Sequence, residues 1–281
     1  EQRPYIHPLS PADVVLNGAD TARERYPGTP FLLFGDPARL KPPVDRRKGL
    51  SNVLEIVPAE DAVLAEDKPS FALRRRRKSS MWLAVEAAAQ GRADTVVPAG
   101  NTGALHAISM FAMRMHEGAH RPALASFLPT ARGETVMLDL GANLECDADN
   151  LAEFAVMGSV FAQVLLGLDR PKVGLLNVGS EELKGHEELR QAAGWLRREN
   201  SPVAFHGFIE GNDIGTGLVD VIVTDGFTGN VALKSIEGTA KLYTQFVRDA
   251  FRTSTFAKIG YLFASGAWVK LRKRVDPRRY N

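Results

Sequence analysis

Residues 96–107 read VVPAGNTGALHA, and they join a short apolar run to an apolar helical pattern through Gly100-Asn101-Thr102-Gly103. Two glycines around small polar residues leave the first N–H groups of a helix open, where the positive end of the helix dipole attracts an anion. A tight turn with Asn101 or Thr102 as the N-cap explains the same residues. The stretch therefore predicts a strand, a loop and a helix, and it leaves both readings of the loop open.

The same alternation of apolar runs and helical patterns extends along the chain. Strands are expected at 30–35, 53–57, 94–98, 135–140, 172–177, 203–208 and 219–224. Helices are expected at 79–91, 103–117, 148–167, 181–199 and 230–251. Several strands are continuous runs of Val, Leu and Ile, which is typical of strands covered on both faces. The order predicts an α/β fold with a doubly wound sheet.

Composition narrows the class of protein. The chain has 281 residues, of which 44% are hydrophobic and 24% charged, as expected of a soluble globular protein. Its one cysteine, Cys146, excludes a disulfide framework and fits a reducing compartment. No secretory signal is recognised, and no apolar run approaches the roughly 20 residues of a membrane span.

Polar loops follow four of the expected strands. They read AGNTGA from residue 99, LGANLEC from 140, VGSEELKGHEE from 178 and DGFTGNVALK from 225. Because ligands of such sheets gather at the carboxyl ends of the strands, these loops predict a glycine-lined polar crevice.

Two lysines make the crevice more specific. Lys184 and Lys234 lie in the first turns of expected helices, where a cation opposes the helix dipole unless an anion is also present. Each side chain could instead reach water. The same loops carry three asparagines: Asn101, Asn143 and Asn230. Together these residues favour a phosphate site, in which Asp225 would orient a lysine or a substrate group, although aspartate is also common in such turns.

Seven stretches carry a family resemblance. They are RRKSSM, AGNTGALHA, LDLGANLEC, LAEFAVMGSVFA, VGLLNVGSEELKGHEE, FIEGNDIGTGLVDVIVTDGFTGNVALKSIEG and DPRRYN. From about residue 13 to the last residue, the chain resembles the bacterial phosphate acyltransferase (PlsX) family. The resemblance implies transfer of an acyl group from acyl-[acyl carrier protein] to inorganic phosphate, which gives acyl phosphate for phospholipid synthesis. It also implies a three-layer, Rossmann-like fold akin to phosphotransacetylases and isocitrate dehydrogenase, and a cytoplasmic homodimer that associates peripherally with membranes.

The residues and the resemblance together give the expected site. Phosphate would be bound by Gly100, Asn101, Thr102, Gly103 and Asn143. Catalysis would rest on Lys184, Asp225, Asn230 and Lys234, with no metal and no cofactor. We find no GxSxG elbow, and Cys146 has no histidine close in sequence, so phosphate itself is expected to be the nucleophile.

The expected organisation is a single α/β domain over residues 1–281, with a helical hairpin at 244–275. The family's DAMGGD-like first loop and its later segment containing KSHG are not present in this chain. Two alternatives stay open. One is a phosphotransacetylase-like enzyme that uses acyl-CoA, and the other is an inactive remnant that binds acyl carrier protein or membrane.

One motif points to different chemistry. HEGAH at 116–120 matches the zinc pattern H-E-x-x-H. Gly118 interrupts it and Pro122 follows closely, so the helix that zinc binding requires should already have ended. We therefore expect no metal site there.

Two basic segments remain. Arg74, Arg75, Arg76 and Arg77 form either a solvated loop or a docking patch for the acidic acyl carrier protein. Residues 240–281 hold ten Lys/Arg and two Asp/Glu, a balance of +8. The expected hairpin mixes these cations with apolar side chains and would meet a second subunit or an anionic membrane. Its outward residues would be Phe251, Phe256, Tyr261 and Leu262. No nucleic-acid-binding motif is recognised.

Overall fold

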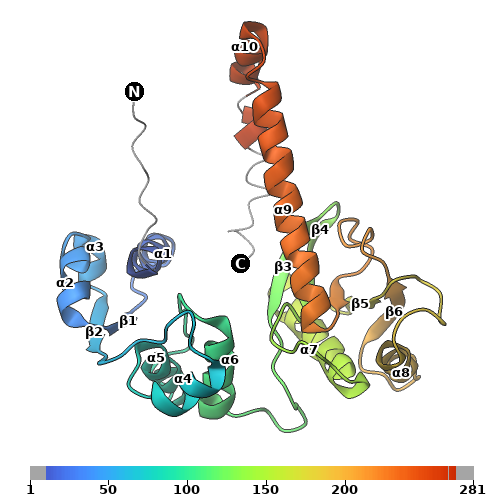
Figure 1. The fold of residues 1–281 in the computed structure, drawn as a ribbon, viewed down its shortest axis with the longest axis horizontal. Helices are drawn as coiled ribbons and strands as arrows, with labels where there is room; N and C mark the ends of the chain where they lie inside the picture. Colours follow the sequence, from blue (N-terminus) through green and yellow to red (C-terminus); the bar gives the residue numbers. More distant parts are fainter. Residues whose placement is uncertain (1–10, 265, 270–281) are drawn as a thin grey trace. The chain divides into compact units, whose positions relative to one another are not determined.

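The computed structural model describes residues 11–264 and 266–269. The chain divides between Gly118 and Ala119 into two compact units. Both mix helices with parallel strands, which confirms the predicted α/β class (Figure 1).

The first unit begins with a small parallel sheet. Its strands, β1 (Phe31–Gly35) and β2 (Leu54–Pro58), pair in parallel. Three helices accompany them: α1 (Pro11–Arg25), α2 (Pro37–Asp45) and α3 (Lys48–Ser51). Leu16, Val44 and Leu50 are buried among these elements and form their core.

A helical cluster completes the first unit. It contains α4 (Pro69–Arg75), α5 (Ser80–Ala89) and α6 (Thr102–Met113). Trp82, Val85 and Ile108 are buried between them. The Ser79 hydroxyl caps α5 by accepting a hydrogen bond from the Trp82 N–H at 3.3 Å.

The expected strand at 94–98 is wrong. These residues form no strand in the structure, and Val97 is 77% exposed. A strand needs a neighbour that shares its backbone hydrogen bonds, and no described strand pairs with this segment. It runs as an irregular connection into α6.

The second unit is built on a five-stranded sheet with the order β3-β4-β7-β5-β6. Its strands are β3 (Ala125–Thr130), β4 (Gly133–Leu138), β5 (Lys172–Leu176), β6 (Ala204–Ile209) and β7 (Val221–Val223). The strands β4, β7, β5 and β6 are parallel, and β3 pairs antiparallel with β4. The sequence pattern missed β3, a six-residue strand that includes Pro129.

Helices cover both faces of this sheet. On one face, α7 (Ala148–Leu166) and α8 (Glu187–Leu196) pack over a core that includes Val221 and Val223. On the other face, Ile222 contacts a second core, to which α9 (Gly226–Ala250) contributes Ala232 and Leu233. Burial on both faces explains why these strands read as continuous apolar runs.

Helix α7 is the one described helix whose length and hydropathy would allow it to cross a membrane. Its Phe154, Ala155 and Ala162 are fully buried in the core of the second unit. Packing against the sheet therefore accounts for its apolar composition.

Two helices lie in the described part of the expected helical hairpin. Helix α9 extends well beyond the sheet and is followed by α10 (Thr255–Phe263), with one more helical turn at 266–269 (Figure 1). The helices are joined at 251–254, where the Ser254 hydroxyl caps α10 by accepting the Ala257 N–H at 3.0 Å. Residues 270–275 of the expected hairpin lie outside the described part of the chain.

Candidate functional site

Three of the four predicted polar loops meet at one edge of the second unit's sheet. They follow the carboxyl ends of β4, β5 and β7, which are parallel neighbours. Backbone hydrogen bonds join two of them: the Asp139 N–H donates to the Thr224 carbonyl at 3.0 Å, and the Gly226 N–H donates to the Asn143 carbonyl at 2.7 Å. Sheet topology thus assembles residues far apart in sequence, as expected.

Asp139 organises the loop after β4. Its side chain is fully buried, and its carboxylate accepts backbone N–H groups from Leu124, Gly141, Ala142 and Asn143 at 2.7–3.2 Å. A carboxylate that binds four backbone donors fixes the path of the loop. The sequence analysis missed this residue, although an aspartate at the end of an apolar strand, just before Gly-Ala-Asn, was a usable signal.

Hydrogen bonds within the protein hold the side chain of Asn143. Its side chain is 5% exposed, and its amide donates to Asp139 Oδ2 and to the Pro122 carbonyl, both at 2.9 Å. Both amide hydrogens are therefore used within the protein, and phosphate binding by Asn143 stays a prediction.

The N-terminus of α9 lies directly over this loop. Asp225 caps the helix by accepting the Thr228 N–H at 2.8 Å, which starts α9 earlier than the expected residue 230. A β-carbon on Gly226 would lie 2.6 Å from the Asn143 carbonyl oxygen, so only glycine allows this approach. A β-carbon on Gly141 would lie 3.6 Å from that of Asn230, which places Asn230 beside the loop.

The two predicted lysines are exposed. Lys234 lies four residues after Asn230 on α9, and its Nζ is 3.2 Å from Glu237 Oε2. The Lys184 side chain is 57% exposed, and its Nζ is 3.8 Å from Glu181 Oε1. Both ammonium groups are accessible to an anion from solvent.

The loop that carries Lys184 replaces the expected start of a helix at 181. Asn177 donates to the Lys184 carbonyl at 3.0 Å and accepts the Val178 N–H at 2.8 Å. Gly185 has φ +85° and lies against the Asn177 side chain. These contacts hold residues 178–185 as a loop, so α8 begins at Glu187. Asn177 was not singled out by the sequence analysis.

The fourth loop, Gly100 to Gly103, belongs to the first unit. Asn101 is the N-cap of α6 and accepts the Ala104 N–H at 3.0 Å, which selects it over Thr102. Its amide donates to the Leu64, Ala65 and Asp67 carbonyls at 2.8–3.2 Å. The turn reading therefore holds for Asn101, while an anion site at Gly100, Asn101, Thr102 and Gly103 stays a prediction.

Cys146 is unsuited to nucleophilic attack. Burial raises the pKa of its thiol to about 11, and its Sγ contacts the Asn143 carbonyl at 3.6 Å. Because the thiolate is the nucleophile, this cysteine is unreactive near neutral pH.

The histidines of HEGAH are not arranged as a metal site. His120 pairs with Glu153, and hydrogen bonding to that carboxylate raises the pKa of the imidazole. Among the residues that the structure describes, no group of three or more His, Cys, Asp or Glu side chains could hold a metal ion.

The basic cluster in the first unit has two parts. Arg76 binds Asp61 at 2.9 Å and Asp67 at 3.0 Å, and the pKa of Asp67 is lowered by the Leu64 N–H and then by Arg76. Arg77 lies over the rings of Trp82 and Phe111 at 5.3 and 5.5 Å. Arg74 and Arg75 are exposed. Two of the four arginines in the predicted docking patch, Arg76 and Arg77, therefore contact other side chains of the protein.

The hairpin aromatics also divide into two groups. Phe251, Tyr261 and Trp268 form a cluster, in which Phe251 lies 5.3 Å from Tyr261 and 5.2 Å from Trp268. Phe251 therefore packs against two other aromatic rings of the same segment, and its outward position stays a prediction. Phe256 is 87% exposed, as expected. The side chain of Leu262 lies outside what the structure describes.

Comparison with known proteins gives a consistent relationship. Residues 9–281 match the model of the family described as "Fatty acid synthesis protein". The chain is 58% identical over 269 residues to a phosphate acyltransferase of Rhodospirillum centenum, covering 96% of this chain and 76% of the relative. It is 54% identical to a phosphate acyltransferase of Paramagnetospirillum magneticum, covering 96% of this chain and 77% of the relative.

Solved structures share the fold. EutD phosphotransacetylase from Staphylococcus aureus has a TM-score of 0.59 and 18% identity, covering 83% of this chain and 81% of its own. A branched-chain phosphotransacylase from Enterococcus faecalis has a TM-score of 0.52 and 16% identity, covering 81% and 82%. These likenesses confirm the predicted Rossmann-like, phosphotransacetylase-like fold.

Proposed function

The chain belongs to the phosphate acyltransferase (PlsX) family, and from this premise we propose that it transfers an acyl group from acyl-[acyl carrier protein] to inorganic phosphate. The product would be an acyl phosphate for phospholipid synthesis. The observation that carries the proposal is the match of nearly the whole chain to relatives named phosphate acyltransferase. The edge of the sheet described above supports it, because glycine loops and two accessible lysines gather there.

The reaction needs little from the protein beyond position and charge. A phosphate oxygen attacks the thioester carbonyl carbon, the new C–O bond forms, and the carbonyl oxygen becomes an oxyanion. The C–S bond then breaks, and the thiolate leaves and takes a proton from water. Lys184 and Lys234 would neutralise phosphate, and the Asn230 amide would donate to phosphate or to the oxyanion.

No covalent acyl-enzyme is required in this scheme. The half-buried Cys146 thiol has a pKa of about 11 and would hold its proton during turnover. Asp225 would act by capping α9, which positions Asn230 and Lys234 on the second and third turns of that helix. We therefore assign Asp225 a positioning role rather than direct chemistry.

Substrate delivery would involve two surfaces. Arg74 and Arg75 are exposed and could attract the acidic acyl carrier protein, while Arg76 pairs with Asp61 and Arg77 lies over the ring of Trp82. The α9–α10 hairpin would associate with a second subunit along its stem and with anionic lipid at its tip, where Phe256 is exposed. These two contacts, with a second subunit and with anionic lipid, are those of a cytoplasmic homodimer that binds membranes peripherally.

The deciding experiment measures thioester cleavage by the chain with and without inorganic phosphate. Acyl-[acyl carrier protein] and acyl-CoA are compared at equal concentration, and acyl phosphate is trapped with hydroxylamine. We expect phosphate-dependent cleavage with the carrier protein substrate. Preference for acyl-CoA would favour the phosphotransacetylase-like alternative, and no cleavage with either would favour the inactive remnant.

A further inference from the structure

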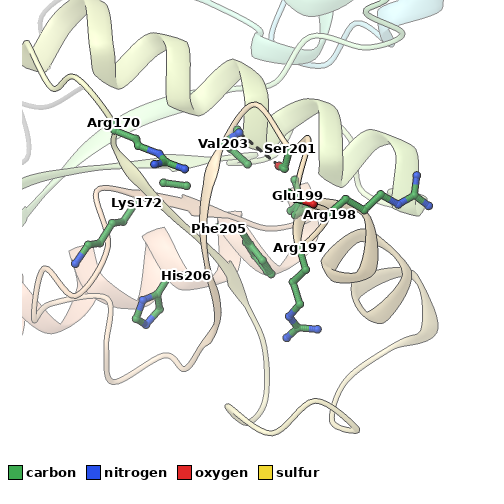
Figure 2. A pocket seen from close by; sticks show the side chains of 11 residues that line it. Arg170, Lys172, Arg197, Arg198, Glu199, Ser201, Val203, Phe205 and His206 are labelled. Atoms are coloured by element: carbon green, nitrogen blue, oxygen red, sulfur yellow. Dashed lines mark hydrogen bonds between the residues drawn. The ribbon is translucent and has the colours of Figure 1, made fainter.

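A cavity lies at the edge of the second unit's sheet opposite to the candidate loops. It opens at the amino ends of β5 and β6, where Lys172 and Ala204 are the first residues of their strands. Its volume is about 550 Å³, which is the size of a small-molecule site. Figure 2 shows the side chains that line it.

The lining is strongly basic. The lining includes one carboxylate, that of Glu199, and four cations, Arg170, Lys172, Arg197 and Arg198. In the described part of the chain, none of the ion pairs includes Arg170, Lys172 or Arg198. Asp220 is nearby, but its carboxylate accepts the backbone N–H of Lys172 at 2.7 Å. These exposed cations would attract an anion that enters the cleft.

Two of the arginines have a simpler explanation. Arg197 is the C-cap of α8 and Arg198 follows it, so both offset the negative end of the helix dipole. In Figure 2, the side chains of Arg197 and Arg198 both extend away from Arg170 and Lys172. The case for a ligand therefore rests on Arg170, Lys172 and His206, which come from three separate segments.

A β-bulge brings His206 to the cavity. Val173 pairs with Phe205 and Gly174 pairs with Gly207, so His206 is an extra residue in β6. Gly207 adopts φ +122°, which favours glycine. As a result the adjacent Phe205 and His206 both line the cavity, although neighbours on a regular strand point to opposite faces.

Aromatic contacts hold Arg197 in place at the same wall. Its guanidinium lies 5.6 Å from the ring centroid of Phe205 and 5.7 Å from that of Phe208, and Glu182 contacts it at 3.3 Å. A guanidinium held in this way loses little freedom when it binds an oxyanion.

We propose that this cleft binds a small molecule with two adjacent phosphate groups, either free pyrophosphate or the diphosphate of a nucleotide. A guanidinium group can donate two parallel hydrogen bonds to the oxygens of one phosphate. The ammonium group of Lys172 would add a further positive charge. A single phosphate would use only part of this array. The site is separate from the lysines of the proposed acyl transfer, so it stands or falls independently of that activity.

The test is isothermal titration calorimetry of the full chain at low salt with ADP, pyrophosphate and inorganic phosphate. We expect one site for ADP or pyrophosphate and binding of inorganic phosphate at least tenfold weaker at this site. Equal affinity for ADP and pyrophosphate would identify the diphosphate as the recognised group, and tighter binding of ADP would identify a nucleotide. Absence of binding by both diphosphates would overturn the proposal.

Variants locate the site. The pair Arg170→Gln and Lys172→Gln should raise the dissociation constant at least tenfold, whereas Lys41→Gln with Arg92→Gln, which removes the same charge from exposed positions in the first unit, should change it less than twofold. Circular dichroism confirms that each variant is folded. Loss of diphosphate binding in Lys184→Ala, with binding retained in the cleft variant, would place the anion at the candidate loops and contradict the proposal.

Discussion

Gly229 of α9 lies against the backbone carbonyl of Asp139, so closely that a β-carbon at position 229 would overlap that oxygen. The same aspartate binds four backbone N–H groups of its surroundings through its carboxylate. The start of α9 and the loop after β4 therefore form one tightly packed piece. This contact sets where Asn230 and Lys234 lie relative to that loop.

The first prediction tests this contact. Gly229→Ala should lower the free energy of unfolding by at least about 2 kcal/mol, because a backbone carbonyl cannot move as a side-chain end can. Gly238→Ala on the same helix is the matched control, since nothing lies within 4 Å of its β-carbon. That change should stabilise the protein by about 0.5–1 kcal/mol through helix propensity. Urea denaturation measures both, and equal stability of the two variants would contradict the close approach.

The second prediction concerns Lys184. Lys184→Ala should reduce phosphate-dependent turnover at least tenfold, which corresponds to about 1.4 kcal/mol of transition-state stabilisation. Stability should change little, because the side chain is 57% exposed. Lys41→Ala, an exposed lysine of the first unit, serves as the control. Unchanged kinetics in Lys184→Ala would remove this lysine from the site.

The third prediction concerns the reactivity of Cys146. Because the thiol has a pKa of about 11 in the folded protein against an ordinary value of 9.0, its thiolate fraction at pH 8 is about a hundredfold lower than that of a free cysteine. Iodoacetamide should therefore label the folded chain slowly and the urea-unfolded chain rapidly. Cys146→Ala should keep the acyl transfer activity. Fast labelling of the folded chain, or loss of activity in the variant, would contradict the buried, structural role.

The same pKa sets a dependence of stability on pH. The folded state holds the thiol proton more tightly than the unfolded state, so its contribution to stability is present below pH 9 and is lost as the pH rises towards 11. Wild type should lose more stability than Cys146→Ala between pH 8 and pH 10.5. Parallel losses in the two proteins would show that burial does not raise the pKa.

The fourth prediction concerns the hairpin. The chain should sediment with anionic vesicles more than with neutral ones, and high salt should weaken binding by screening Arg248 and Arg252. Phe256→Glu should reduce sedimentation, because it puts a charge on an apolar side chain that is 87% exposed. Tyr26→Glu, at an aromatic residue 67% exposed in the first unit, should bind as wild type does. Binding that ignores lipid charge would leave the hairpin only a dimer-packing role.

The sequence predicted β4, β5 and β7 and the helices that cover them. Val136, Val173 and Val221 belong to apolar runs without alternation, and only strands covered on both faces have that pattern. The loops after these strands were also predictable, because glycine and polar residues cannot extend an apolar strand. Because β4, β7 and β5 are parallel neighbours, their carboxyl ends, and the loops that follow them, lie at the same edge of the sheet.

Contacts between distant segments decided the rest. The sequence did not indicate that the Asn143 amide donates to Asp139 and to the Pro122 carbonyl. Residues 181–186 read as the start of a helix, but Asn177 holds them as a loop. Composition and spacing determined the fold class, the family resemblance and the edge of the sheet where polar loops meet. Which polar side chains remain open to a ligand was decided only by the tertiary structure, because an amide or carboxylate binds whichever partner the packed chain places within hydrogen-bond distance.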